Sequence, residues 1–515
     1  VKAPRMAGLF IKIFTWFLES KIIGALMLKK DNKLVSFAEL KEPPLFVPCH
    51  PDHKEGEVKV LQPDLSPAEK VQQAVDCLPL SSEFRRWTIQ DYSKAYTSTP
   101  LMVAKHFINA VRDLQMSFFI NHSEEDILRQ ATESTRRHER GKPISVLDGV
   151  PIAIKDEIDC MPYPTTGGTR WMHKFRPCTD DACCVKHLRS CGAILVGKTN
   201  MHELGAGLSG INPHYGAARN PYDIKKIPGG SSSGSAAVVS AGLCPVALGV
   251  DGGGSVRMPA ALCGVIGFKP TFGRVSHSGV LPLNWTVGMV GVLAGTVEDA
   301  FIVYAAMSGQ LPSHQPNTCL HQFPLLVTNV KLAKSAEWFN DCTDEIRSCC
   351  SKALEQFEVT IPDIEAMRLA HYLTIGSEEL GWDSRVALRV YGAFNSQEYI
   401  NAQKMRSRQM HFHKAIFARA DVIVTPTTGV TAYSIMDDAL KTGELDYING
   451  AALVRYQIAG NFLGLPAVTI PIGYDKLGLP IGLQFIGKPW SEATLIHIAF
   501  AAQALRKPEV FYNML

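Results

Sequence analysis

Two serine-bearing glycine turns carry the residues of this chain that are best suited to chemistry. The first is Gly229-Gly-Ser-Ser-Ser-Gly-Ser235, and the second is Gly249-Val-Asp-Gly-Gly-Gly-Ser-Val-Arg257. Glycine lets the main chain approach a substrate closely and leaves its N–H groups accessible, as phosphate-binding loops and oxyanion holes both require. Because each turn also carries serine hydroxyls, the pair favours nucleophilic attack on a carbonyl group.

The second turn supplies the candidate nucleophile, Ser255, at the start of an expected helix. A serine hydroxyl is a weak nucleophile unless a base takes its proton. Ser231 in the first turn could take that proton if the segment between the turns folds back. The amides around the nucleophile are the candidate oxyanion hole, supplied by Gly252, Gly253, Gly254 and Ser255.

Lys155 is the candidate base that completes the relay. It follows four apolar residues in Gly149-Val-Pro-Ile-Ala-Ile-Lys-Asp156, a run that predicts a buried strand delivering the amine to the interior. Burial disfavours the charged form of lysine and lowers its pKa. A neutral Lys155 could then accept a proton from Ser231.

At these residues the chain resembles the amidase signature family of serine hydrolases, which use a Ser-Ser-Lys triad. The Lys155 segment, the Pro-Gly-Gly-Ser-Ser turn and the Gly-x-Asp-x-Gly-Gly-Ser-x-Arg turn occur in the family's order and spacing, within a similarity that begins near residue 100. The resemblance implies Ser255 as nucleophile, Ser231 as bridging serine after a cis peptide bond, and Lys155 as base. It also implies supporting roles for Ser232 and Arg257, with no cofactor and no metal.

One departure from the family pattern lies directly after the paired serines. The usual Gly-Gly is Ser233-Gly234 in this chain, so a Cβ atom is added to the turn. The local conformation of this turn is therefore open at the level of sequence.

A rival interpretation places the nucleophile elsewhere. Gly230-Ser-Ser-Ser-Gly234 matches the nucleophile elbow of α/β-hydrolases, with Ser232 as nucleophile and a histidine as base. That elbow needs a strand directly before it. The preceding segment is polar and interrupted by proline, so we favour the Ser-Ser-Lys arrangement.

Three further patterns imitate binding motifs. The segment Gly192–Thr199 matches a phosphate loop literally, but its intervening residues predict a buried strand. The segment Gly205–Gly210 matches a dinucleotide fingerprint, but it does not open a helix and is better read as an active-site loop. Cys183, Cys184 and His187 offer three zinc ligands at helical spacing without a second half, which favours a packed helix.

The composition bounds the class of protein. The chain has 515 residues, of which 46% are hydrophobic and 20% charged, as in a globular protein. A net charge of +3 without basic runs argues against a nucleic-acid partner. The 13 cysteines are scattered, which suits a reducing compartment better than a disulfide framework.

The N-terminal segment 1–40 is expected to form a helical extension. Residues 8–28 are long enough to span a bilayer but contain three charges, with polar residues on one helical face and Phe10, Phe14 and Phe17 on the other. This pattern favours a helix lying in a membrane surface. Docking on the protein itself or on a dimer partner, and true spanning, remain alternatives.

The remaining sequence predicts one large catalytic domain behind a linker. Residues 41–98 combine a proline-rich linker with short helices, and residues 99–515 alternate strands and helices. Such alternation predicts an α/β fold, which in the amidase signature family is a mixed, twisted β-sheet flanked by helices on both faces. Residues 310–410 carry few motifs and predict a helical insertion.

The apolar N-terminal segment extends the resemblance to the fatty acid amide hydrolases, and most of all to those of plants. That resemblance implies hydrolysis of N-acylethanolamines to fatty acid and ethanolamine by a homodimer on the endoplasmic reticulum or plasma membrane, with its catalytic domain on the cytosolic side. Met201 is a candidate acyl contact, with core packing as the alternative. An inactive membrane scaffold, a small-amide amidase and an amidotransferase A-type subunit remain alternatives.

Overall fold

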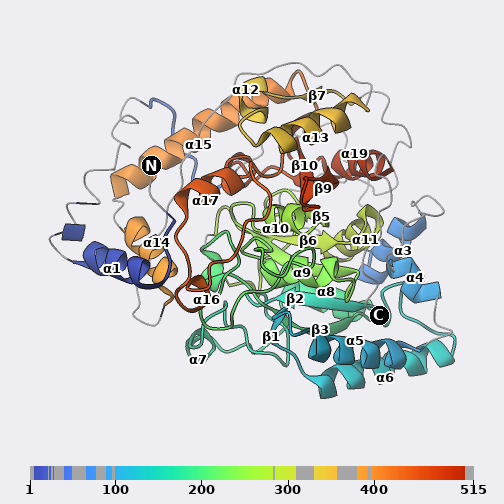
Figure 1. Cartoon of the computed structure of the whole chain (residues 1–515). Helices are drawn as coiled ribbons and strands as arrows, with labels where there is room; N and C mark the ends of the chain where they lie inside the picture. Colours follow the sequence, from blue (N-terminus) through green and yellow to red (C-terminus); the bar gives the residue numbers. More distant parts are fainter. Residues whose placement is uncertain are drawn as a thin grey trace.

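The computed structural model describes residues 5–20, 23–24, 27, 40–48, 65–76, 88–94, 99–281, 285–308, 330–356, 380–392 and 396–504. At its centre lies a mixed ten-stranded sheet with the strand order β1-β3-β2-β4-β6-β5-β9-β10-β8-β7. Helices surround this sheet in Figure 1. The α/β architecture that the sequence predicts is therefore confirmed.

The strands are short and mostly buried. They are β1 (Phe119–Asn121), β2 (Pro151–Lys155), β3 (Ile194–Thr199), β4 (Val246–Asp251), β5 (Ile266–Lys269), β6 (Met289–Ala294), β7 (Leu332–Ala333), β8 (Val422–Pro426), β9 (Ala467–Tyr474) and β10 (Pro480–Gly487).

The helices lie between and around these strands. They are α1 (Gly8–Glu19), α3 (Pro67–Asp76), α4 (Ile89–Lys94), α5 (Pro100–Leu114), α6 (Glu124–Glu139), α7 (Met172–Phe175), α8 (Cys183–Ser190), η2 (Glu203–Gly205), α9 (Ser233–Ser240), α10 (Arg257–Leu262), α11 (Val297–Met307), α12 (Ala336–Phe339), α13 (Asp344–Glu355), α14 (Trp382–Gly392), α15 (Ser396–Phe417), α16 (Ala439–Thr442), α17 (Tyr447–Val454), α18 (Ile458–Phe462) and α19 (Glu492–Ala504).

Strand β2 shows how the sheet separates two hydrophobic layers. Ile152 and Ile154 join a core cluster shared with α3, α8, α11 and α19. Ala153 between them joins a second cluster with α5, α6 and α9. Because successive strand residues point to opposite faces, helices cover both sides of the sheet. A strand buried on both faces explains the uninterrupted apolar run before Lys155.

The parallel pairing of β2 with β4 positions the catalytic candidates of the sequence. Ile154 lies opposite Leu248 in this register. The carboxyl ends of the two strands therefore meet at the same edge of the sheet, where Lys155 ends β2 and Asp251 ends β4. Ligand sites of α/β sheets commonly form at such an edge.

Helix α1 docks on the protein through the face that carries Ile11, Thr15 and Leu18. Thr15 is fully buried and its hydroxyl lies 3.4 Å from the Trp382 carbonyl, while Glu19 pairs with Arg385 of α14 at 2.5 Å. The apolar side chains of Phe10 and Trp16 remain 75% and 66% exposed on the opposite side. Among the described residues, no helix is long and apolar enough to cross a membrane.

The region expected to be a helical insertion is described in part. Residues 330–356 contain α12 and α13, and residues 380–410 contain α14 and most of α15. Residues 310–329, 357–379 and 393–395 of that expectation lie outside the described residues.

Candidate active site

The structure brings Lys155 and Ser231 into direct contact. The Lys155 Nζ lies 2.7 Å from Ser231 Oγ, and both side chains are buried. Lys155 comes from the end of β2, whereas Ser231 precedes α9 and follows a cis Gly230–Ser231 peptide bond. Two residues that lie 76 positions apart in sequence thus form one hydrogen-bonded pair.

The two glycine turns are joined through their backbones. The Ser232 amide donates to the Ser255 carbonyl at 3.2 Å, and the Ser232 hydroxyl donates to the Val250 carbonyl at 3.4 Å. Ser255 and Ser231 both line the same cavity. The side chain of Ser232 supports this junction.

The departure at Ser233 is accommodated by a hydrogen bond. The Ser233 hydroxyl donates to the Asn200 carbonyl at 3.2 Å, and the Gly234 amide donates to the same oxygen at 2.8 Å. Only glycine fits at position 234, because a Cβ there would lie 2.3 Å from the Phe118 carbonyl oxygen. The added Cβ of Ser233 therefore fits the turn, while the following glycine is required.

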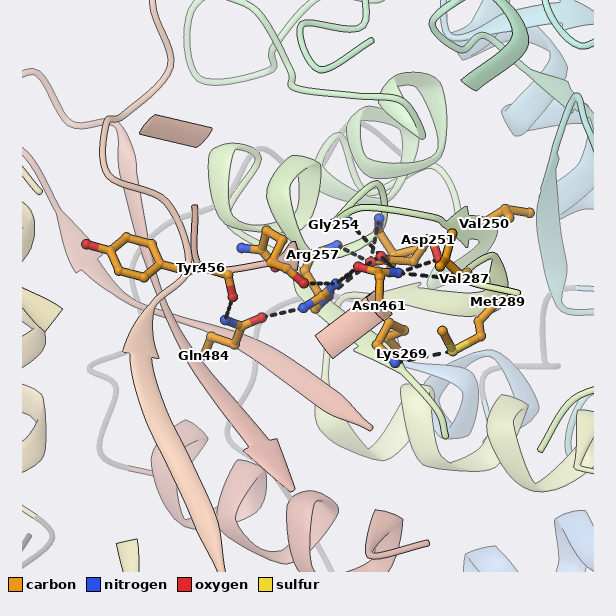
Figure 2. A network of polar contacts seen from close by, with 12 residues as sticks. Val250, Asp251, Gly254, Arg257, Lys269, Val287, Met289, Tyr456, Asn461 and Gln484 are labelled. Atoms are coloured by element: carbon orange, nitrogen blue, oxygen red, sulfur yellow. Dashed lines mark hydrogen bonds and ion pairs between the residues drawn. The ribbon is translucent and has the colours of Figure 1, made fainter. Parts of the chain in front are cut away.

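A buried ion pair holds the Ser255 turn in shape (Figure 2). Arg257 donates to Asp251 through Nε and a terminal nitrogen, each at 3.0 Å. The same guanidinium reaches Asn461 at 2.5 Å and Gln484 at 2.7 Å, so it ties the turn to α18 and β10. Burial alone would raise the pKa of Asp251, but the charge and hydrogen bonds of Arg257 outweigh burial and hold that pKa well below its usual range.

The prediction that the Gly254 amide belongs to the oxyanion hole is corrected by the structure. Its amide donates to the Asp251 carboxylate at 2.7 Å instead of remaining available for a substrate oxygen. Its φ of +106° suits glycine. The cavity is lined by Gly252, Gly253 and Ser255, and Gly254 is not among its lining residues. The reason for the difference is that Asp251 must itself be stabilised, and the nearest amides do so.

Besides Ser231, the Lys155 amine contacts the carboxylate of Glu157, a residue that the sequence interpretation missed. The Lys155 Nζ lies 2.7 Å from Glu157 Oε1 and 3.2 Å from the Val250 carbonyl. Burial lowers the pKa of Lys155, and the Glu157 carboxylate opposes that shift. Burial likewise raises the pKa of Glu157, against the effect of Lys155. Both groups therefore shift toward their neutral forms. The signal available in the sequence was that Glu157 lies only two positions after Lys155.

A largely apolar cavity of about 360 Å³ opens onto these groups. Polar side chains of Glu157, Ser231, Ser255, His277 and Asn461 contribute to its wall. Leu208 and Val250 of the apolar wall lie in segments that the sequence singled out. The rest of that wall comes from distant segments that sequence reasoning did not identify, namely Val280, Leu281, Trp285, Val287, Val454, Ile458 and Phe462.

Met201 does not belong to this cavity wall. Its side chain is fully buried and absent from the lining residues, so the expected acyl contact is corrected to core packing. By contrast, Gly205 and Leu208 do line the cavity, in agreement with an active-site loop at 205–210.

The rival motifs adopt structures unlike the sites they imitate. Residues Ile194–Thr199 form strand β3, as the buried-strand interpretation predicted for the phosphate-loop match. Cys184 is buried in the hydrophobic core, while Cys183 faces His187 at 3.8 Å on the same helix. No strand directly precedes the Ser231 turn, so the elbow geometry of α/β-hydrolases is not formed.

Comparisons with known proteins identify the family of this chain. The Amidase family model matches residues 108–377 and 371–496. A fatty acid amide hydrolase of Arabidopsis thaliana is 42% identical, covering 100% of this chain and 96% of that protein. A fatty acid amide hydrolase of Medicago truncatula is also 42% identical, again covering 100% of this chain and 96% of that protein.

More distant relatives match most of the length of this chain. The A-type subunit of a glutamyl-tRNA(Gln) amidotransferase from Alkaliphilus metalliredigens is 31% identical over 81% of this chain and 96% of that protein. The solved structure of a native peptide amidase from Stenotrophomonas maltophilia matches with a TM-score of 0.64 and 25% identity, covering 82% of this chain and 98% of that chain. The chain therefore belongs to the amidase signature family of enzymes and is similar over its whole length to plant fatty acid amide hydrolases.

Proposed function

We propose that this chain is a membrane-associated serine amidase that hydrolyses N-acylethanolamines to free fatty acid and ethanolamine. The observation that carries the proposal is the 2.7 Å contact between Lys155 and Ser231 at the wall of a largely apolar cavity. The contact suits amide chemistry, and the apolar wall suits an acyl chain. The names of the full-length relatives support the same substrate class.

In the proposed relay, neutral Lys155 accepts a proton from Ser231 while Ser231 accepts one from Ser255. The Ser255 oxygen attacks the amide carbonyl, and the oxyanion is received by the amides of Gly252, Gly253 and Ser255. The proton then returns through Ser231 to the departing nitrogen, since an unprotonated amine anion is a poor leaving group. Water completes the cycle by hydrolysing the acyl-enzyme.

The cavity supports a long acyl group more than a small amide. Its apolar wall draws on α17 and α18 as well as the segments around Val280 and Val287. Burial of each methylene in such a wall contributes about 0.8 kcal/mol. A short amide would leave most of this surface unused, so binding should increase with acyl length until the cavity is filled.

The exposed side of α1 supports attachment to a membrane surface. Leu9, Phe10, Ile13, Trp16 and Phe17 form an exposed apolar stripe, because their spacing places them on one helical face. Because the opposite face of α1, with Ile11, Thr15 and Leu18, is buried and Thr15 and Glu19 contact α14, the stripe faces away from the protein. We propose an endoplasmic reticulum or plasma membrane location on the cytosolic side, and a homodimer, as further parts of this function.

Hydrolysis tests the catalytic part of the proposal. Wild type and Ser255→Ala are assayed on a long-chain N-acylethanolamine and on a short primary amide, and both proteins are treated with a fluorophosphonate probe. Preference for the long chain, with activity and labelling lost in Ser255→Ala, is expected. Better turnover of the short amide would favour a small-amide amidase, and labelling that persists in Ser255→Ala would refute the assigned nucleophile.

Sedimentation tests the membrane part separately. Trp16→Glu is compared with Phe175→Glu, whose side chain is 80% exposed on α7 and outside the stripe. We expect only Trp16→Glu to lower the fraction that sediments with anionic phospholipid vesicles. Equal sedimentation of both variants would argue against α1 as the contact. Analytical ultracentrifugation of wild type reports the oligomeric state.

A further inference from the structure

Glu157 occupies a place in the site that the triad does not explain. Its side chain is 4% exposed, contacts Lys155 Nζ at 2.7 Å and contributes to the cavity wall. It directly follows Asp156, whose carboxylate instead accepts from the amides of Thr166 and Gly168 and pairs with Lys198 at 3.3 Å. The two adjacent acids therefore serve different partners, and only Glu157 faces the relay.

The three contacts of the Lys155 amine are not equivalent. The Val250 carbonyl lies at 3.2 Å and can only accept a hydrogen bond. The oxygen of the ionised Glu157 carboxylate lies at 2.7 Å and is likewise only an acceptor. Ser231 at 2.7 Å can donate or accept. A neutral amine has two N–H groups and one lone pair. If the two N–H groups point to Val250 and Glu157, the lone pair is left facing Ser231, as a base requires.

We propose that Glu157 is a positioning residue that orients the amine of Lys155 toward Ser231 and controls the fraction of Lys155 that is free to act as a base. This inference rests on the proposed Ser-Ser-Lys function. The acceptor oxygen of Glu157 provides the orientation, and its negative charge favours the ammonium form of Lys155. Removing the charge while keeping the oxygen separates these two effects.

The charged surroundings of the pair are few among the described residues. Asp251 also acts on Lys155 and favours its charged form. Glu157 is affected by Asp156 and Lys198 besides Lys155. Each of these neighbours is buried and held by its own partners, so a change at Glu157 should alter the charge balance of Lys155 directly.

The test measures the rate of fluorophosphonate labelling of Ser255 between pH 5 and pH 10, because this reaction needs the relay but no particular substrate. Glu157→Gln keeps an acceptor oxygen without the charge. Since the carboxylate favours the ammonium form, its removal should let Lys155 become neutral at lower pH. On the acid limb, Glu157→Gln should label roughly tenfold faster than wild type, each rate taken relative to its own plateau.

Glu157→Leu removes both the oxygen and the charge. Its acid limb should also move to lower pH, but its plateau should fall by ~10- to 100-fold because the lone pair is no longer directed at Ser231. Glu444→Gln is the matched control, since Glu444 is a buried carboxylate paired with Arg5 outside the cavity. Its profile should coincide with that of wild type.

The outcomes separate this inference from the proposed function. Labelling that persists in Ser255→Ala would refute the triad itself. If Ser255→Ala is unlabelled but the acid limb of Glu157→Gln coincides with that of wild type, the triad stands and the role of Glu157 is overturned. A plateau in Glu157→Leu equal to that of wild type would also overturn it. Thermal unfolding midpoints verify that each variant is folded.

Discussion

Replacing Arg257 by leucine should destabilise the protein in a pH-dependent manner. The guanidinium is fully buried and donates to Asp251, Asn461 and Gln484 (Figure 2). Removing one partner of a buried ion pair costs about 3–5 kcal/mol. The amides of Gly254 and Val256 still donate to the Asp251 carboxylate, so we expect the lower part of this range.

The expected change in melting temperature follows from chain length. At about 2.1 cal/mol/K per residue, unfolding of 515 residues has an entropy of about 1.1 kcal/mol/K. A loss of about 3–4 kcal/mol therefore lowers the midpoint by about 3–4 °C when the chain unfolds as one unit. Arg408→Leu is the control, because the Arg408–Glu42 pair is partly exposed and solvent screening weakens its contribution to stability.

The sign of the pH dependence distinguishes loss of charge pairing from simple loss of packing. In wild type the pKa of Asp251 is lowered, so its stabilising contribution is present above the unfolded pKa and is lost as pH falls through the folded pKa. In Arg257→Leu burial should raise the pKa of Asp251 above its unfolded value. The folded variant then binds a proton more tightly, and its deficit should shrink as pH falls.

Differential scanning calorimetry at pH 8, 6 and 5 measures this effect. The gap in midpoint between wild type and Arg257→Leu should be widest at pH 8 and narrowest at pH 5. The double variant Asp251→Asn with Arg257→Leu should show a gap that is nearly independent of pH. A gap for Arg257→Leu that is equal at the three pH values, or smaller than that of Arg408→Leu, would refute the reasoning.

Three further changes test the site. Lys155→Met should lower amide turnover by roughly 10²- to 10⁴-fold, because the relay loses its base; hydrolysis near wild-type rate would exclude Lys155 from that role. Gly254→Ala should lower the melting temperature, because the added Cβ would lie 2.5 Å from Gln457 Cγ and the φ at this position is +106°. Gly252→Ala is the control, since its added Cβ would meet nothing within 4 Å and the variant should melt like wild type. Equal melting temperatures for the two variants would contradict this reasoning. Ile458→Trp should raise KM for a long-chain amide and leave that for an acetyl amide nearly unchanged, and a parallel rise would show that Ile458 does not contact the acyl chain.

The contact between Lys155 and Ser231 and the class of fold could be predicted from the amino-acid sequence. The apolar run before Lys155 required a strand buried on both faces, and the glycine turns required close backbone approach at Ser231 and Ser255. These patterns are local, because hydrophobic periodicity, backbone propensity and motif spacing each depend on only a few neighbouring residues. The mixed sheet with helices on both faces followed from the alternation of such segments together with the family resemblance.

The contacts between distant segments could be known only from the assembled fold. The Gly254 amide is taken by Asp251, whose buried charge is balanced by Arg257, and this arrangement depends on Asn461 from a segment 210 residues away. The cavity wall likewise combines segments from residue 157 to residue 462. No local pattern encodes such contacts, because their geometry exists only once the sheet has been assembled. Glu157 lies between the two cases, since its spacing from Lys155 was visible but its contact with the amine depended on the fold.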